Sequence, residues 1–334
     1  MIEQTKPTLG SLFMIGIPGT TIDDSTRDLI HRHGVHNFIL FKRNVESPEQ
    51  LKNLCTDLKN TCLANNLPTP LISIDQEGGS VTRLPPPFSQ FPHQRQLADA
   101  VNSEALLEQY ARTCAKELTA IGINMNLAPV LDVCPAGQGY FMEKRCLGTD
   151  AARVSHLGMI VVREMQRGGL AACVKHFPGL GRAVIDPHLE LPVVSSDKAS
   201  LTSVDLVPFE AACGSNVAAC MTSHAIYEQL DLQRPATLSR TIITDILRKT
   251  FKYEGLVITD DLEMGAIEKS NYGENAALEA FLAGADLMLI CQEHSKVRKA
   301  LDAFDQALQS GVFEIESVLR ALVRQNKVRS QYTA

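Results

Sequence analysis

Eight short apolar runs recur along the chain, and each is followed by a loop and then by a stretch with helical periodicity. The runs are 12–17, 38–41, 71–74, 125–133, 171–174, 217–221, 256–258 and 287–290. Because they are apolar at nearly every position rather than at every second one, they are typical of strands buried on both faces, as in a parallel sheet. Eight such strands alternating with helices predict a single (β/α)8 TIM barrel, a fold that typically needs about 250 residues. The 334 residues of the chain are enough for this fold and for long loops.

The stretches between the runs carry apolar residues at the three- and four-residue spacing of amphipathic helices. We expect helices over 48–58, 103–118, 153–167, 238–250 and 275–283, and a closing helix near 313–325. The alternative architecture, an open doubly wound sheet, usually carries a G-x-G-x-x-G turn after its first strand. The segment from Gly16 to Gly19 matches that turn poorly, and no linker or low-complexity tract is visible. We therefore expect one catalytic domain over residues 1–334.

Net charge and cysteine content narrow the class of protein. The formal net charge of -6 disfavours a nucleic-acid partner or an anionic membrane surface, since both favour basic patches. The amino-terminal segment lacks the order of a signal peptide, and no apolar run approaches the roughly 20 residues of a membrane span. The nine cysteines form no Cys-x-x-Cys pair. We expect a cytoplasmic monomer that binds neither nucleic acid nor membrane.

Charged or polar residues end five of the eight apolar runs or directly follow them. They are Asp75, Asp132, Lys175 with His176, His224, and Asp260 with Asp261. Each alone has a structural explanation, because an aspartate at such a place commonly caps a helix and a single histidine commonly lies satisfied in the core. In a barrel, however, the carboxyl ends of all strands form one rim, where barrel enzymes carry their catalytic residues. The coincidence of these residues on one rim predicts an active site there.

Seven motifs combine these residues with their neighbours, in order, within a resemblance to a known family that runs from about residue 9 to about residue 291. The motifs are Ser73-Ile-Asp75-Gln-Glu-Gly-Gly-x-Val-x-Arg83, Asn126-Leu-Ala-Pro-Val-Leu-Asp132-Val, Lys175-His176-Phe-Pro-Gly-x-Gly, Asp186-x-His188-x-x-Leu-Pro, Met221-Thr-x-His224, Pro235-Ala-Thr-Leu-Ser239 and Ile258-Thr-Asp260-Asp-Leu-x-Met264. Together they resemble glycoside hydrolase family 3, in particular its cytoplasmic β-N-acetylglucosaminidases (NagZ type) of peptidoglycan recycling.

The resemblance implies a role for each matching residue. Asp260 would be the nucleophile, and His188, paired with Asp186, the general acid/base. The residues implied for the sugar pocket are Asp75, Arg83, Arg145, Lys175 and His176, with His224 and Met264 lining it. The implied reaction removes a terminal non-reducing GlcNAc, in this group from GlcNAc-1,6-anhydro-N-acetylmuramic acid muropeptides. The implied architecture is the barrel alone.

The expected chemistry needs a carboxylate near the anomeric carbon and a proton donor on the side of the leaving group. The donor is usually a second carboxylic acid, whereas Asp186-Pro-His188 offers a histidine. An imidazole has an ordinary pKa of about 6.5, so it can both donate and accept a proton near neutrality. Asp186 can orient the ring as the aspartate of a hydrolase triad does. Glu77 and Glu190 are the alternative acids.

The stretch 179–186 lacks periodicity, which favours a long, mobile loop after the fifth strand that brings His188 over the sugar when substrate binds. Two positions depart from the family pattern. Leu180 stands where the family usually has His, and Pro187 where it usually has Ser. Proline fixes its own φ and favours an extended backbone at Asp186.

Other activities fit parts of the same pattern. A phosphorylase or a β-glucosidase of the same family is an alternative. A histidine near the glycosyl enzyme tolerates an anionic phosphate acceptor better than a carboxylate does. A lyase or aldolase would use Lys175 as a Schiff base, which gives the carboxylates no role. A non-catalytic sugar-binding barrel would need no nucleophile. We expect no metal and no cofactor, since a zinc motif such as H-E-x-x-H is missing from the sequence.

Overall fold

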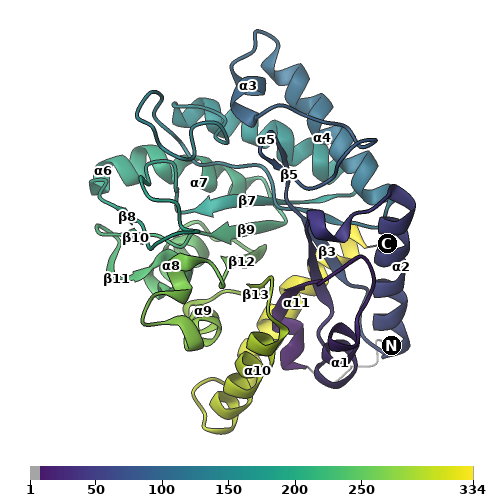
Figure 1. Ribbon diagram of the computed structural model, residues 1–334. Helices are drawn as coiled ribbons and strands as arrows, with labels where there is room; N and C mark the ends of the chain where they lie inside the picture. The colour runs from purple at the N-terminus through teal and green to yellow at the C-terminus, as the bar shows by residue number, and fades with distance from the viewer. Residues whose placement is uncertain (1–7, 334) are drawn as a thin grey trace.

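The computed structural model describes residues 8–333, which form a closed barrel of eight parallel strands (Figure 1). The strands follow one another around the barrel in the order β1-β13-β12-β9-β7-β6-β3-β2. They are β1 (Phe13–Gly16), β2 (Asn37–Leu40), β3 (Leu71–Ile74), β6 (Met125–Asn126), β7 (Ala171–Phe177), β9 (Ala219–Thr222), β12 (Leu256–Asp261) and β13 (Leu287–Ile290). The predicted (β/α)8 TIM barrel is therefore confirmed, and the doubly wound sheet is excluded.

Helices surround the barrel. The longer ones are α1 (Asp24–His33), α2 (Pro48–Ala64), α4 (Ser103–Ala120), α5 (Ala151–Arg167), α7 (Val207–Gly214), η5 (Thr241–Thr250), α9 (Ala276–Ala283), α10 (His294–Gln309) and α11 (Ile315–Tyr332). Short helical turns are η1 (Leu9–Leu12), η2 (Lys42–Asn44), α3 (Gln94–Ala98), α6 (Lys198–Ser200), η3 (Leu201–Asp205), η4 (Ala236–Leu238), α8 (Gly265–Glu268) and η6 (Gly273–Asn275). Two small sheets lie outside the barrel, namely β4 (Gln76–Gly78) with β5 (Val81–Thr82), and β8 (Val193–Val194) with β10 (Ile226–Tyr227) and β11 (Asp231–Pro235).

Short polar side chains begin several of these helices. Asp23, Ser47 and Asp150 each accept a hydrogen bond from a backbone N–H in the first turn of α1, α2 and α5 respectively. Such caps satisfy amide groups that have no partner within the helix. At its other end α1 stops at Gly34, whose φ of 70° is the left-handed conformation that glycine adopts most easily. These local signals explain where the helices begin and where α1 ends.

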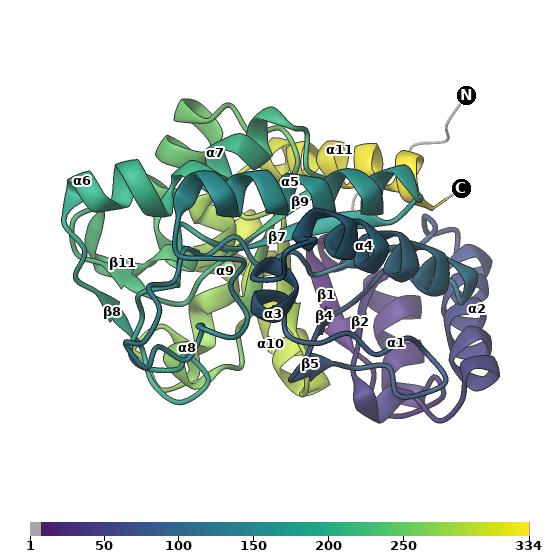
Figure 2. The ribbon, with the colours of Figure 1, turned by 90° about the horizontal axis from the view of Figure 1, so that it is seen from above.

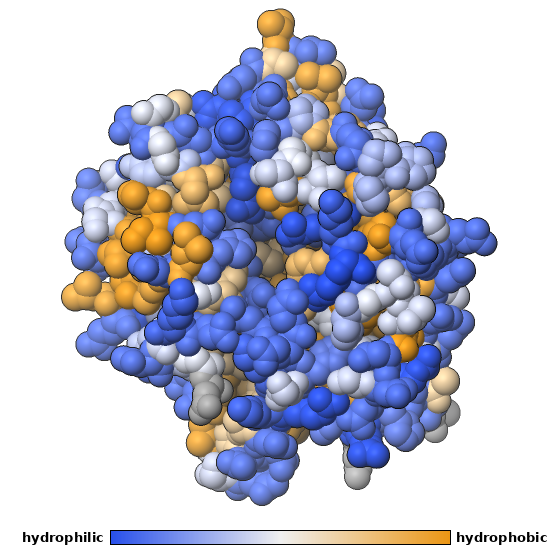
Figure 3. Space-filling model, viewed as in Figure 1, coloured by the Kyte–Doolittle hydropathy of each residue, from blue (hydrophilic) through white to orange (hydrophobic). Residues whose placement is uncertain are grey.

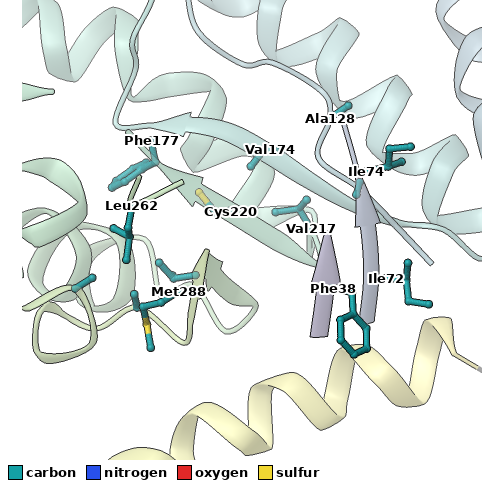
Figure 4. Close-up of a cluster of buried hydrophobic side chains, with 14 of the residues drawn as sticks. Phe38, Ile72, Ile74, Ala128, Val174, Phe177, Val217, Cys220, Leu262 and Met288 are labelled. Atoms are coloured by element: carbon teal, nitrogen blue, oxygen red, sulfur yellow. The ribbon is translucent and has the colours of Figure 1, made fainter. Parts of the chain in front are cut away.

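Alternate residues of the barrel strands belong to two separate apolar cores. One set, including Met14, Ile39 and Cys173, fills the inside of the barrel. Their neighbours in sequence point outward and pack between the strands and the helices, and Phe38, Ile72, Ile74, Val174, Cys220 and Met288 are drawn there in Figure 4. Because both faces of every strand are buried, the runs read as continuously apolar rather than alternating.

All eight predicted strands are confirmed, although one is shorter than expected. The fourth was expected over 125–133, whereas β6 covers Met125–Asn126 and is followed by an isolated bridge between Val130 and Lys175. Pro129 has no N–H to give to a strand ladder, so the regular pairing is interrupted between β6 and Val130. The predicted helices fall within α2, α4, α5, η5, α9 and α11, apart from one to three residues at an end. Within residues 8–333, no helix combines the length and the apolar character needed to cross a membrane.

The carboxyl ends of the barrel strands face one side of the molecule. Seen from above, β5, β8 and α8 lie along the lower edge, opposite α7 and α11, so they gather on the face that Figure 1 turns toward the viewer (Figure 2). Figure 3 shows the same face as a surface, hollowed near its middle and bordered mainly by hydrophilic side chains. The loops that follow β3, β6, β7 and β12 therefore supply this face.

Candidate active site

A cavity of about 90 Å³ lies where the loops after β3, β6, β7 and β12 meet. Nine of the ten residues expected from the sequence line it, namely Asp75, Arg83, Arg145, Lys175, His176, Asp186, His188, Asp260 and Met264. The remaining lining residues are Val81, Phe141, Leu180 and Pro187. The structure thus brings together side chains that are up to 189 positions apart, from Asp75 to Met264.

One wall of the cavity is a chain of alternating charges. The Lys175 Nζ lies 2.7 Å from Asp75 Oδ1 and 2.7 Å from Glu77 Oε1. At one end of the chain, Arg83 Nη2 lies 3.3 Å from Asp75 Oδ2. At the other end, Arg145 donates to both oxygens of Glu77, from Nε at 2.9 Å and from Nη2 at 2.7 Å. Such a two-pronged pair fixes the guanidinium plane, so the position of Arg145 is set before any ligand arrives.

Burial and ion pairing act in opposite directions on these groups, and ion pairing prevails. Burial alone raises the pKa of Asp75 and of Glu77, but the neighbouring cations hold each pKa below its ordinary value. Burial lowers the pKa of Lys175, but Asp75 and Glu77 raise it by more, so the pKa lies above its ordinary value. Glu77 is thus an ionised carboxylate with both oxygens occupied, which disqualifies it as the proton donor. Lys175 is held as an ammonium, whereas Schiff-base chemistry requires the free amine.

These charges suit the hydroxyl groups of a sugar. A hydroxyl both donates and accepts a hydrogen bond, so it fits between a fixed cation and a fixed carboxylate. Arg83 also lines the cavity, and its guanidinium supplies further N–H donors. Its guanidinium also lies over the ring of Phe41, 5.6 Å from the centroid, which restricts its position. The wall offers donors and acceptors in a rigid array, as carbohydrate binding requires.

Two neighbouring aspartates end β12, and the structure distinguishes them. Asp260 lines the cavity, and its Oδ1 accepts the N–H of Asp261 at 2.8 Å. The carboxylate of Asp261 instead accepts the backbone N–H of Glu263 at 3.1 Å and that of Cys291 at 3.3 Å. Burial raises the pKa of Asp261 to about 7. Asp261 is therefore a turn-forming residue outside the cavity lining, and Asp260 is the carboxylate available to a ligand.

The loop 178–192 connects β7 to β8 and carries Asp186 and His188. Asp186 Oδ1 lies 2.7 Å from His188 Nδ1 and also accepts the backbone N–H of His188 at 3.0 Å. Burial raises the pKa of Asp186, but the hydrogen bonds from His188 outweigh burial and lower it. An ionised Asp186 on Nδ1 leaves Nε2 of His188 for proton transfer. Glu190, the other alternative acid, is exposed and does not line the cavity.

Backbone contacts hold this loop at both ends. At its start, Leu180 donates its N–H to Asp132 Oδ1 at 2.6 Å, and Tyr227 donates its hydroxyl to Gly179 O at 3.0 Å. Near its end, the N–H of Ala266 in α8 donates to Pro187 O at 2.9 Å. The expected long loop after the fifth barrel strand is thus confirmed in position, and its mobility stays a prediction.

Two histidines expected at the site, His176 and His224, occupy different positions relative to the cavity. His176 lines the cavity, with its Nδ1 2.8 Å from Asp132 Oδ2. His224 is fully buried behind the wall, with Nδ1 2.8 Å from Thr237 Oγ1 and Nε2 2.9 Å from Asp261 O. The expectation that His224 lines the pocket is therefore not met, because both ring nitrogens are engaged by the protein. His224 instead supports the end of β12 beside Asp260.

Sequence reasoning gave a different role, or none, to three contributors to the site. Glu77 was considered as an acid, whereas it holds Arg145 and Lys175 in place. Asp132 joins His176 to the start of the loop 178–192, and its place within the Asn-Leu-Ala-Pro-Val-Leu-Asp motif was the available signal. Phe141 gives the cavity an apolar wall. It lies in the long connection between β6 and α5, where the sequence has no periodicity from which to place it.

A larger cavity of about 680 Å³ lies at the opposite, amino-terminal end of the barrel, beside Pro70 and Asn124. The described residues that line it include Lys52 and Lys59 but no carboxylate and no imidazole. This larger cavity therefore lacks the acid and base groups that line the smaller one. Within residues 8–333, no three or more His, Cys, Asp or Glu residues are grouped so that they could hold a metal ion.

Comparison with known proteins agrees with this arrangement. The model of the glycosyl hydrolase family 3 N terminal domain matches residues 5–328. A β-hexosaminidase from Pseudomonas aeruginosa is 34% identical over 297 residues, which cover 89% of this chain and 87% of that protein. A family 3 β-N-acetylglucosaminidase from a Paenibacillus species has a similar structure, with a TM-score of 0.92 and 37% identity over 97% of this chain. This chain spans 61% of the length of that protein.

NagZ from Neisseria gonorrhoeae, solved in complex with N-trifluoroacetyl-D-glucosamine, is also similar, with a TM-score of 0.81 and 28% identity. The similarity covers 95% of this chain and 89% of that one.

Proposed function

The chain belongs to glycosyl hydrolase family 3 and is a β-N-acetylhexosaminidase of that family; from this premise we propose that it is a retaining exo-β-N-acetylglucosaminidase with Asp260 as nucleophile and His188 as acid/base. The observation that carries the proposal is the common cavity of Asp260 and the Asp186–His188 pair. A carboxylate and a proton donor on the same cavity are what hydrolysis with retention needs.

In the first step, a carboxylate oxygen of Asp260 forms a bond to the anomeric carbon while the bond to the aglycone oxygen breaks. Protonated His188 transfers its Nε2 proton to that oxygen, so the aglycone leaves as a neutral alcohol. Asp186 stays ionised and holds the Nδ1–H side of the ring. The product of this step is a glycosyl ester on Asp260.

In the second step, neutral His188 accepts a proton from water as the water oxygen attacks the anomeric carbon. The ester bond breaks, Asp260 becomes a carboxylate again, and His188 returns to the imidazolium form. Two inversions at the same carbon give retention of the β configuration. One group thus serves as acid and then as base, which suits an imidazole near neutral pH.

We further propose that the substrate is a GlcNAc-1,6-anhydro-N-acetylmuramic acid muropeptide of cell-wall recycling, cleaved in the cytoplasm. The support is similarity over most of both chains to NagZ, whose structure holds an N-acylated glucosamine. The nine cysteines are free thiols in the structure, as a reducing compartment favours. The alternating charges of Arg83, Asp75 and Lys175 would bind the hydroxyls of this sugar.

Three substitutions test the catalytic proposal on one substrate. On p-nitrophenyl β-N-acetylglucosaminide, we expect Asp260→Ala to abolish release of nitrophenol and His188→Ala to slow it by about a hundredfold or more, within the range of general acid–base catalysis. Glu190→Ala, on the same loop but exposed and away from the cavity, is the matched control and should keep wild-type activity. Full activity in Asp260→Ala would refute the assignment.

The substrate and the acceptor are tested separately. We expect the aryl β-N-acetylglucosaminide to be cleaved much faster than the aryl β-glucoside, and the reverse would make the enzyme a β-glucosidase. We also expect turnover to be independent of inorganic phosphate, with free GlcNAc as product. Phosphate-dependent release of a sugar 1-phosphate would instead identify a phosphorylase.

A further inference from the structure

A buried ion pair lies at the base of the catalytic loop. Asp205 ends the short helix η3 just before α7, and its side chain is fully buried. Arg182, which belongs to the loop, places its Nε 3.4 Å from Asp205 Oδ1. Within residues 8–333, this is the one ion pair that joins a side chain of the loop 178–192 to the rest of the protein. It lies six positions before His188.

The pair is not satisfied as a structural pair usually is. Neither carboxylate oxygen of Asp205 makes a hydrogen bond within the described residues, and the Nε of Arg182 makes none either. Burial raises the pKa of Asp205 to about 7, Arg182 lowers it and Asp132 raises it. A buried carboxylate without hydrogen bonds is costly, because the attraction of one cation does not replace its hydration. Such a group in a folded protein calls for an explanation other than stability.

The rest of the loop explains what the pair holds. Leu180 is fixed to Asp132, and Pro187 is fixed to Ala266 in α8. Between these two anchors Ala183 is buried, whereas Val184 and Ile185 are 75% and 43% exposed, so these two larger side chains do little to hold the segment. Arg182 therefore supplies the side-chain contact that sets the direction in which the chain runs from its first anchor toward Asp186.

We propose that Arg182 and Asp205 are positioning residues that hold the catalytic loop so that His188 reaches the oxygen of the leaving group. The inference rests on the proposed function, in which His188 is the general acid. Neither residue lines the sugar cavity, so each acts through the loop. The pair costs stability because its hydrogen bonds are incomplete, but it holds Arg182 in place. A neutral residue at position 205, although better satisfied, would leave Arg182 free to turn toward solvent.

The dependence of rate on the leaving group separates positioning of the acid from general damage. Phenol is a poor leaving group and needs a proton from His188, whereas 2,4-dinitrophenolate leaves without one. The ratio kcat/KM reports the steps up to formation of the glycosyl enzyme. For Arg182→Gln and Asp205→Asn, we expect kcat/KM on phenyl β-N-acetylglucosaminide to fall about tenfold or more, below the full contribution of a general acid. On the 2,4-dinitrophenyl glycoside we expect a fall of less than about threefold.

Controls keep the inference open to refutation. Arg182→Lys retains the positive charge and should recover part of the loss seen in Arg182→Gln. Arg298→Gln breaks a comparable, partly exposed ion pair with Asp28 between α10 and α1, far from the loop, and should leave both substrates unaffected. An equal loss on both substrates, or no loss on either, would overturn the positioning role. If Asp205→Asn does not fold, the two Arg182 variants alone decide. If the unaltered enzyme cleaves neither glycoside, the proposed function itself fails.

Discussion

Replacing Gly265 with alanine tests how closely α8 must approach the catalytic loop. The N–H of Gly265 donates to His188 O at 3.3 Å, directly behind the acid/base. A Cβ on Gly265 would lie 2.6 Å from Leu189 O and 2.7 Å from His188 O. Ordinary contact begins at 3.4 Å, so the loop or α8 would have to move by 3.4 - 2.6 = 0.8 Å. Both obstructing atoms belong to the main chain and cannot rotate away.

The expected consequence is a loss of activity accompanied by a loss of stability. Proton transfer requires a heavy-atom separation of about 2.6–3.2 Å, so a displacement of 0.8 Å exceeds the whole allowed interval. A misplacement of about 1 Å can cost about a hundredfold in rate. We therefore expect kcat/KM of Gly265→Ala on phenyl β-N-acetylglucosaminide to fall by tens to about a hundredfold. Crowding should cost about 1–3 kcal/mol of unfolding free energy.

Steady-state rates and urea denaturation measure the two effects on the same sample. Gly214→Ala in α7 is the matched control, because a Cβ there meets no atom within 4 Å. It should keep wild-type kcat/KM. Retention of more than half the wild-type kcat/KM by Gly265→Ala would show that the position of His188 does not depend on contact with α8, and the geometric reasoning would be wrong.

Two further predictions concern buried charges. Glu77→Gln leaves Lys175 and Arg145 without their shared carboxylate. We therefore expect urea denaturation to show a loss of about 3–5 kcal/mol of unfolding free energy, and steady-state rates to show a raised KM. The control Glu108→Gln, at an exposed ion pair, should cost less than about 1 kcal/mol of unfolding free energy. The folded-state pKa of Asp205 is about 7 against an ordinary 3.8, so its contribution to stability is full below the lower value and is lost as the pH rises through the higher one. Asparagine does not titrate, so the Tm of Asp205→Asn minus the Tm of the wild type should become more positive from about pH 5 to about pH 8 in thermal scans. A constant or falling difference in Tm would contradict the raised pKa of Asp205. Arg182, Asp132 and Tyr227 are the charged or titratable groups that influence Asp205. Asp261, whose pKa burial also raises to about 7, is present in both proteins, so its titration cancels in the difference.

The barrel and the residues at its rim could be predicted because each depends on a local and repeated signal. A strand buried on both faces must be apolar throughout, so eight runs predicted eight barrel strands, and the residues that end them had to share one rim. Asp75, Lys175 and Asp260 were found in this way. The choice of Asp260 over its neighbour came from the family resemblance, and the structure supports it, because Asp261 is occupied by two backbone N–H groups.

Features that depend on contacts between distant segments could not be predicted. The pairing of Glu77 with Arg145 and Lys175 and the placement of Arg182 beside Asp205 join residues that lie 23 to 98 positions apart. The burial of His224 likewise depends on its contacts with Thr237 and Asp261. Nothing in the composition of residues 179–186 indicates that Arg182 faces inward while Val184 faces solvent. The identity of such a residue suggests a role, but only the packing of η3 and α8 against the loop defines it.

Trapping the glycosyl enzyme tests the central claim most directly. A 5-fluoro β-N-acetylglucosaminyl fluoride forms the ester readily and releases it slowly, because the second fluorine destabilises the positive charge that develops at the anomeric carbon. The account predicts that peptide mapping by mass spectrometry finds one added glycosyl group on the peptide containing Thr259, Asp260 and Asp261, with the label on Asp260. A label on Asp261 or elsewhere, or turnover of the reagent with no labelled peptide at any time, would contradict it.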